Sequence, residues 1–207
     1  MGWGEDVDAL QSRLISLGVR CEHLSVNLAE VSAPKLIMDT VEGRLGAAAV
    51  LVNNAVHDPV DAPFDQLDAQ TLDAYYAVNI RGTMLLSVEF ARRFTGGTGG
   101  RIINMTSGQG RGPMPGKIAY VASKGAIEAF TVTLAAEVAP LGITVNAVDP
   151  GPTDTGWMTD EIKEFLLPRF PMGRIGQPED AARLIAFLAS EPAGWVTGQI
   201  IRSTGGF

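Results

Sequence analysis

The chain has 207 residues, of which 46% are hydrophobic and 19% are charged, and its formal net charge is −7. This length suits one domain with a substantial core, and the acidic balance without a basic cluster argues against a nucleic-acid partner. No apolar run approaches the roughly 18 charge-free residues of a membrane span, and the N-terminus lacks the pattern of a signal peptide, so we expect a cytoplasmic protein that does not bind a membrane.

Metal binding is not expected from the sequence. The single Cys21 cannot form an internal disulfide, and neither His23 nor His57 has a second plausible ligand nearby in the chain.

The first part of the chain alternates between helical and strand patterns. Residues 5–17 carry an apolar stripe at helical spacing that ends at Gly18, and residues 31–45 form a second helical pattern. Residues 19–28 are predicted to form a short strand. Residues 47–53 are apolar on both faces, which is typical of a strand inside a parallel sheet.

The middle of the chain continues the alternation. We predict a long amphipathic helix over 68–94, a strand over 101–106, a helix over 119–141 and a strand over 143–148. The glycine run at 96–100 follows a helix and opens a strand. A phosphate-binding loop has the opposite order, so this run predicts a flexible connection.

The last part begins with residues 156–170, an irregular segment with a short helical stretch and several large apolar side chains. It suits either a substrate lid or an ordinary surface excursion. Pro178 opens a helix to residue 190, and residues 199–203 form the final strand. Strands that alternate with helices throughout predict an α/β fold with a doubly wound parallel sheet.

Candidate catalytic side chains lie in the segment 107–124, SGQGRGPMPGKIAYVASK, which runs from a strand end through a Gly/Pro-rich loop into a helix. Tyr120 and Lys124 are four residues apart, so they share one face of that helix. An ammonium group that close favours the phenolate over the phenol, which suits a general acid or base. Ser107, at the strand end, could hydrogen-bond the oxygen that receives the proton.

Three further motifs accompany this segment. Asn53-Asn-Ala55 closes a strand, Asn79 lies inside the long helix, and the run DPGPTDT at 149–155 follows a later strand. In this order the set resembles the short-chain dehydrogenase/reductase family, over residues 7–207. The resemblance implies a single Rossmann-like domain over 1–207 and an NAD(P)-dependent oxidoreductase of the 3-oxoacyl reductase kind.

The resemblance also implies a role for each catalytic residue. Tyr120 would transfer the hydroxyl proton, Lys124 would assist it and bond the nicotinamide ribose, and Ser107 would orient the carbonyl oxygen. Asn79 would hold a water in a proton relay to Lys124, although a buried Asn at a helix kink is the alternative. Thr106 neighbours Ser107, but the 13-residue spacing to Tyr120 favours Ser107.

The cofactor, NAD or NADP, would contact fewer residues. Val56 stands where the family has Gly, and a β-branched residue there resists a positive φ and close backbone approach. The expected contacts are Asn27, Asn53 and Ala55 on the adenosine side, Tyr120 and Lys124 at the ribose, and Pro150, Gly151, Thr153 and Thr155 on the other side.

The chain departs from the family at its beginning. Family members open with a strand, a Gly-rich turn, a helix and a second strand, and no such pattern precedes residue 19. Without those strands, the strand over 47–53 is expected to become an open, apolar edge. Three explanations are open: a natural start further upstream, a fragment of a longer chain, or a short chain with another role.

Two other functions compete with the oxidoreductase. A non-catalytic relative could use the helices over 68–94 and 119–141 as an oligomerisation partner, since in the family these helices build homodimers and homotetramers. A lyase or isomerase could use Tyr120 as a base without nicotinamide. The sequence names neither the small carbonyl or alcohol substrate nor the choice between NAD and NADP.

Overall fold

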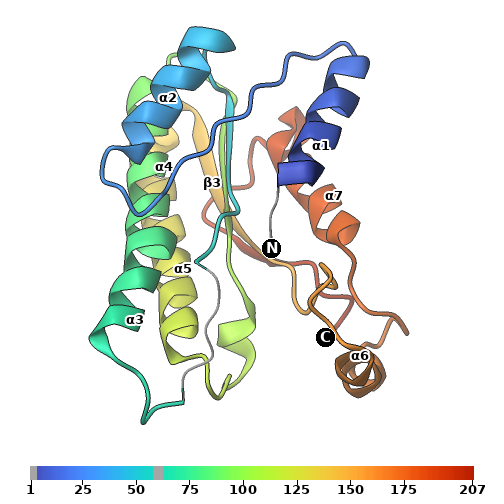
Figure 1. Ribbon diagram of the computed structural model, residues 1–207. Coiled ribbons are helices and arrows are strands. Elements are labelled where there is room, and N and C mark those ends of the chain that lie inside the picture. The colour runs from blue at the N-terminus through green and yellow to red at the C-terminus, as the bar shows by residue number, and fades with distance from the viewer. Residues whose placement is uncertain (1–3, 58–62) are drawn as a thin grey trace.

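The computed structural model of the chain describes residues 4–57 and 63–207. Figure 1 shows a central sheet with α2, α4 and α5 on one face and α1 and α7 on the other. The helices are α1 (Gly4–Ser16), α2 (Ala33–Arg44), α3 (Ala69–Tyr75), α4 (Thr83–Arg93), α5 (Ile118–Val138), α6 (Asp160–Leu166) and α7 (Pro178–Ala189). The strands are β1 (Val50–Asn53), β2 (Gly100–Met105), β3 (Ile143–Asp149) and β4 (Ile200–Arg202).

The sheet is entirely parallel in the described residues, with the strand order β1-β2-β3-β4. Every residue of β3 is buried, as is every residue of β2 except the half-buried Met105. Strands covered by helices on both faces of a parallel sheet are buried at successive positions. The parallel α/β fold predicted from the sequence is confirmed.

The core lies in two layers, one on each face of the sheet. Ile102 packs with Phe90 and Leu134 beneath α4 and α5, whereas its neighbour Ile103 packs with Leu188 beneath α7. Successive side chains of a strand point to opposite faces, so adjacent isoleucines serve the two layers. The sheet is therefore doubly wound.

The strand predicted over residues 19–28 is wrong. This segment follows α1 and forms no hydrogen bonds of a β-sheet in the described structure. Arg20 attaches it to the end of α2, because its guanidinium donates to the carbonyl oxygens of Arg44 (3.2 Å) and Leu45 (2.7 Å). A strand forms only beside a neighbour that supplies its hydrogen bonds, and no described strand lies next to this segment.

Strand β1 forms an edge of the sheet, as the sequence predicts, although it begins only at Val50. Among the described strands it pairs with β2 alone. Val50 and Val52 are 41% and 40% exposed, because nothing in the described part of the chain covers them. The apolar edge expected from the sequence is thus present.

The helix predicted over 68–94 changes its winding at its centre. Asp68 caps α3 by accepting a hydrogen bond from the Thr71 amide (2.7 Å). A π-helical segment, η1 (Tyr76–Gly82), then separates α3 from α4. Such wide turns inside α-helices frequently mark functional positions, and Asn79 lies in this one.

The glycine run at 96–100 connects α4 to β2, as predicted. Gly142, with φ +73°, packs against this connection at the turn before β3. A Cβ at Gly142 would lie 2.3 Å from the Gly97 carbonyl oxygen, so both the backbone conformation and the close approach require glycine.

Helix α5 with the following turn (Ile118–Leu141) is long and apolar enough, by length and composition alone, to cross a membrane, and it is the one such stretch in the described residues. It packs instead along the sheet, where Ile127 and Leu134 are buried. An apolar helix covering a parallel sheet explains this composition.

Candidate active site

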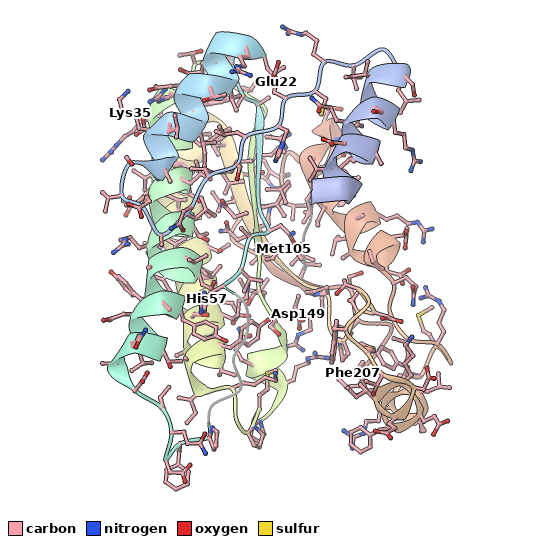
Figure 2. All side chains as sticks on the ribbon, viewed as in Figure 1. Glu22, Lys35, His57, Met105, Asp149 and Phe207 are labelled. Carbon is pink, nitrogen blue, oxygen red and sulfur yellow. The ribbon has the colours of Figure 1, made fainter. Side chains whose placement is uncertain are left out.

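The carboxyl ends of β1, β2 and β3 bring the predicted site residues together. Figure 2 shows His57, Met105 and Asp149, which follow or end these three strands, at the same end of the sheet. Ligands of open α/β sheets bind at this end, because the loops that follow parallel strands gather there.

Tyr120 and Lys124 lie in the first two turns of α5, where the sequence places them. The Lys124 ammonium nitrogen lies 5.8 Å from the centre of the Tyr120 ring and donates a hydrogen bond to the Met105 carbonyl oxygen (2.9 Å). This bond ties the start of α5 to the end of β2. The helix and the strand thereby set the position of the ammonium group beside the phenol.

Lys124 is only 6% exposed, and this burial lowers its pKa from 10.5 to about 8. At neutral pH most of the side chain is therefore still protonated. Its ammonium group has three N–H donors, and the Met105 carbonyl is its one hydrogen-bond acceptor in the described residues. Two donors remain for a ligand that carries hydroxyl groups.

The two neighbouring hydroxyls after β2 have different surroundings. Thr106 is 3% exposed, and its hydroxyl donates to the Glu128 carboxylate (3.0 Å) and accepts from the Gln109 amide (3.1 Å). Ser107 is half-buried and extended, just before the 3-10 turn η2 (Gly108–Arg111). Thr106 thus fastens the loop to α5, which supports the choice of Ser107 as the functional hydroxyl.

Asn79 is 2% exposed and joins two other segments through its amide. Its oxygen accepts a hydrogen bond from the His57 backbone N–H (2.8 Å), and its nitrogen donates to the Ser123 hydroxyl (3.0 Å). Ser123 in turn donates to the Tyr120 carbonyl oxygen (2.7 Å). Asn79 therefore links the loop after β1 to the turn of α5 that carries Tyr120.

Sequence reasoning missed three residues of this arrangement. His57 packs edge-on against Tyr75 (ring centres 5.1 Å apart), and Tyr75 packs edge-on against Tyr120 (6.4 Å). Ser123 is the third. The position of Ser123, three residues after Tyr120 on the same helix, could have indicated its part in the site. Tyr75 and His57 come from distant segments, so the sequence held no comparable signal for them.

The adenosine-side residues occupy two loops. Asn27 is exposed and accepts a hydrogen bond from the Ala29 N–H (3.0 Å), within a turn that Arg81 fastens to η1. Ala55 and Val56 are exposed after β1. No described residue other than glycine has a positive φ, so Val56 does not adopt the backbone conformation open to glycine.

Asn53 has a structural role that the sequence did not predict. Its amide nitrogen donates to the Ser87 hydroxyl (2.9 Å) and to the Asn104 side-chain oxygen (2.8 Å), and the Asn104 amide donates to Thr131 (2.9 Å). Both Asn53 amide hydrogens are used within the protein. Any contact of this side chain with a cofactor is thus left to its oxygen.

The loop after β3 carries the remaining predicted contacts. Gly151 has φ +62°, and an added Cβ would meet the Thr204 methyl group at 2.9 Å, so this position requires glycine. The Thr153 hydroxyl donates to the Pro150 carbonyl oxygen (3.2 Å) and closes the turn. Thr155 is exposed.

These residues fit a nicotinamide dinucleotide best at its reactive end. Tyr120, the two free Lys124 donors and the Pro150–Gly151 turn gather around the ends of β2 and β3. A parallel doubly wound sheet with such groups at its carboxyl end defines a dinucleotide-binding enzyme of the Rossmann class.

Comparison with known proteins identifies the family. A family model described as enoyl-(acyl carrier protein) reductase matches residues 4–207. The chain is 56% identical to an uncharacterized oxidoreductase, YjdA, of Bacillus subtilis, over 99% of this chain and 83% of the relative. It is 34% identical to the 3-oxoacyl-[acyl-carrier-protein] reductase of Staphylococcus aureus, over 99% and 84% respectively.

A solved structure agrees with this result. The short-chain dehydrogenase of Burkholderia cenocepacia in complex with NADP superposes with a TM-score of 0.91 at 31% identity, covering 99% of this chain and 83% of the other. The chain belongs to the short-chain dehydrogenase/reductase family and is an NAD(P)-dependent oxidoreductase. A non-catalytic role as an assembly partner is not favoured by relatives that are named as oxidoreductases.

Proposed function

We propose that the chain reduces the ketone of a 3-oxoacyl thioester, with Tyr120 as the proton donor. The observation that carries the proposal is the buried Lys124 ammonium group, held 5.8 Å from the Tyr120 ring at the end of β2. The Staphylococcus aureus relative, named as a 3-oxoacyl reductase, supports the substrate class.

The roles of the side chains follow from their chemistry. Ser107 donates a hydrogen bond to the carbonyl oxygen and orients it, and Tyr120 gives its hydroxyl proton to that oxygen as the alcohol forms. The positive charge of Lys124 stabilises the negative charge left on the Tyr120 oxygen, and its free donors hold the ribose. When bound, the nicotinamide supplies the hydride for the carbonyl carbon.

Asn79 positions this group. Its links to His57 and Ser123 hold the Tyr120 turn of α5 against the loop after β1. We assign to Asn79 the water of the proton relay toward Lys124. The contacts with the dinucleotide are assigned to Asn27, Asn53, Ala55, Pro150, Gly151, Thr153 and Thr155.

The first experiment is a thermal-shift titration with NADH and, separately, NADPH. A ligand at about 100 times its dissociation constant stabilises the folded state by roughly 2.7 kcal/mol. A saturable shift with either nucleotide supports the proposal and identifies the preferred cofactor. No shift in a folded sample contradicts dinucleotide binding by the 207-residue chain.

A turnover assay then separates reduction from other chemistry. The expected result is oxidation of the nicotinamide in step with loss of a 3-oxoacyl thioester. Product formed without nicotinamide would indicate a lyase or isomerase that uses Tyr120 as a base.

We also propose that the chain forms a homodimer or homotetramer in the cytoplasm. Large apolar side chains are exposed on α3, η1, α4 and α5, and two of them, Leu72 and Tyr76, line a hollow of about 260 Å³. A second copy of the chain would cover them, and mass measurement by light scattering tests this. The exposed residues are Leu72, Tyr76, Leu85, Ile118 and Val132.

A further inference from the structure

An arginine outside the Tyr-Lys pair connects the loops around the site. Arg111 ends η2, four residues after Ser107. Its Nη1 donates to the Phe207 carbonyl oxygen (2.6 Å), and its guanidinium lies 5.2 Å from the centre of the Phe207 ring. Figure 2 shows Phe207 beyond Asp149, at the same end of the sheet.

The same guanidinium faces a buried carboxylate. Its Nε lies 3.5 Å from an oxygen of Asp149, a side chain that is 2% exposed. This contact is an ion pair and not a hydrogen bond, since Nε has no hydrogen-bond partner. The other Asp149 oxygen accepts from the Gly151 N–H (2.9 Å). Asp149 thus links Arg111 to the turn that carries Pro150 and Gly151.

These contacts begin where the backbone ladder stops. The last hydrogen bond between the β2 and β3 chains joins the Thr106 N–H to the Val148 carbonyl oxygen (2.9 Å). Ser107 follows immediately, and beyond this point no backbone bond in the described residues holds its loop to the loop after β3. Only side chains can then set the separation of the two loops.

Phe207 extends the connection to a third segment. Its ring packs against Phe170 (centres 4.7 Å apart), directly after the 3-10 turn Leu167–Arg169 that follows α6. Arg111 therefore contacts the end of β3 directly, through Asp149, and reaches the segment after α6 only through Phe207.

We infer that Arg111 is a positioning residue, which, with Asp149 as its partner, holds Ser107 at the correct distance from the Pro150–Gly151 turn. The inference rests on the proposed role of Ser107. Neither Arg111 nor Asp149 contacts Tyr120 or Lys124 in the described structure. Both residues are therefore inferred to affect catalysis through Ser107.

A double-mutant cycle in the full chain tests this inference. We expect Arg111→Met to lower kcat by about ten- to a hundred-fold, since small displacements of a substrate-orienting group cost that much. In a Ser107→Ala background the same substitution should change kcat by less than about two-fold, because its effect passes through Ser107. The inference would be overturned if Arg111→Met lowered kcat by the same factor in the wild type and in Ser107→Ala. An unchanged kcat in Arg111→Met would overturn it too.

Two controls separate positioning from loss of fold. Arg183→Met removes an arginine on α7 whose side chain is 78% exposed, and it should leave kcat unchanged within about two-fold. Arg111→Lys keeps the charge but not the fork that reaches both Asp149 and Phe207, so it should also lower kcat. If Arg111→Met fails to fold, Arg111→Lys carries the same cycle.

Hydrogen exchange gives a readout that does not depend on turnover. In Arg111→Met, the amides of residues 108–116 and 203–207 should exchange faster, while those of β3 stay protected. If exchange is faster in Arg111→Met but the wild-type chain has no reductase activity, Arg111 holds the loops together and the proposed function is wrong. If the wild-type chain is an active reductase but exchange is unchanged in Arg111→Met, the proposed function stands and the inference about Arg111 is wrong.

Discussion

At the scale of single residues, the proposed proton transfer depends on the Tyr120 hydroxyl. Tyr120→Phe removes only the oxygen, and the ring can keep its edge-on packing against Tyr75. We expect kcat to fall by about 10²- to 10⁴-fold, the usual contribution of a general acid, with little change in melting temperature. Steady-state kinetics and a thermal melt measure both, and undiminished kcat would rule out Tyr120 as the proton donor.

Lys124 gives a second residue-scale prediction, on stability. Burial holds its pKa at about 8 in the folded state against 10.5 in the unfolded chain. Between these values the unfolded state binds more protons, so this lysine makes the folded state more stable as pH rises from about 8 to about 10.5. Relative to Lys124→Met, the wild type should gain up to about 3 kcal/mol over this window.

Urea unfolding at several pH values measures this gain. Lys35→Met is the matched control, because the Lys35 side chain is 73% exposed. The gain relative to Lys35→Met should be small. An equal gain relative to both variants would mean that burial of Lys124 is not its cause.

At the scale of elements, the π-helical segment η1 is held by Asn79. Asn79→Ala leaves the His57 N–H without its acceptor, whereas the Ser123 hydroxyl keeps its hydrogen bond to the Tyr120 carbonyl oxygen. One unsatisfied buried group costs about 1–3 kcal/mol, so we expect the free energy of unfolding to fall by about that amount in denaturant titrations. Asn27→Ala removes the same type of side chain from an exposed turn and should cost under about 1 kcal/mol.

At the scale of the whole molecule, the open edge at β1 predicts self-association. Val52 is 40% exposed on a strand that pairs with β2 alone in the described sheet. Val52→Lys should delay aggregation several-fold in turbidity and thioflavin assays, because a charge on an edge strand opposes pairing. Val31→Lys is the control, because Val31 is 70% exposed and lies outside β1. If Val31→Lys delays aggregation equally, the change in net charge, and not the edge strand, explains the delay.

The sequence by itself determined the order and type of most elements and the Tyr120–Lys124 pair. Hydrophobic periodicity and the i,i+4 spacing are local properties, so they are readable without a fold. Ser107 was predicted from its place at a strand end, and the family resemblance added Asn79 and the Pro150–Gly151 turn. The strand expected over 19–28 failed because a strand depends on a neighbour, which periodicity does not reveal.

Only the tertiary structure decided which side chains act together. Asn53 uses its amide hydrogens on Ser87 and Asn104, and Arg111 meets residues 38 and 96 positions away, Asp149 and Phe207. Burial of Lys124, which lowers its pKa, likewise follows from α5 packing against the end of β2. Such long-range contacts arise when the sheet assembles, because parallel strands gather distant loops at one end.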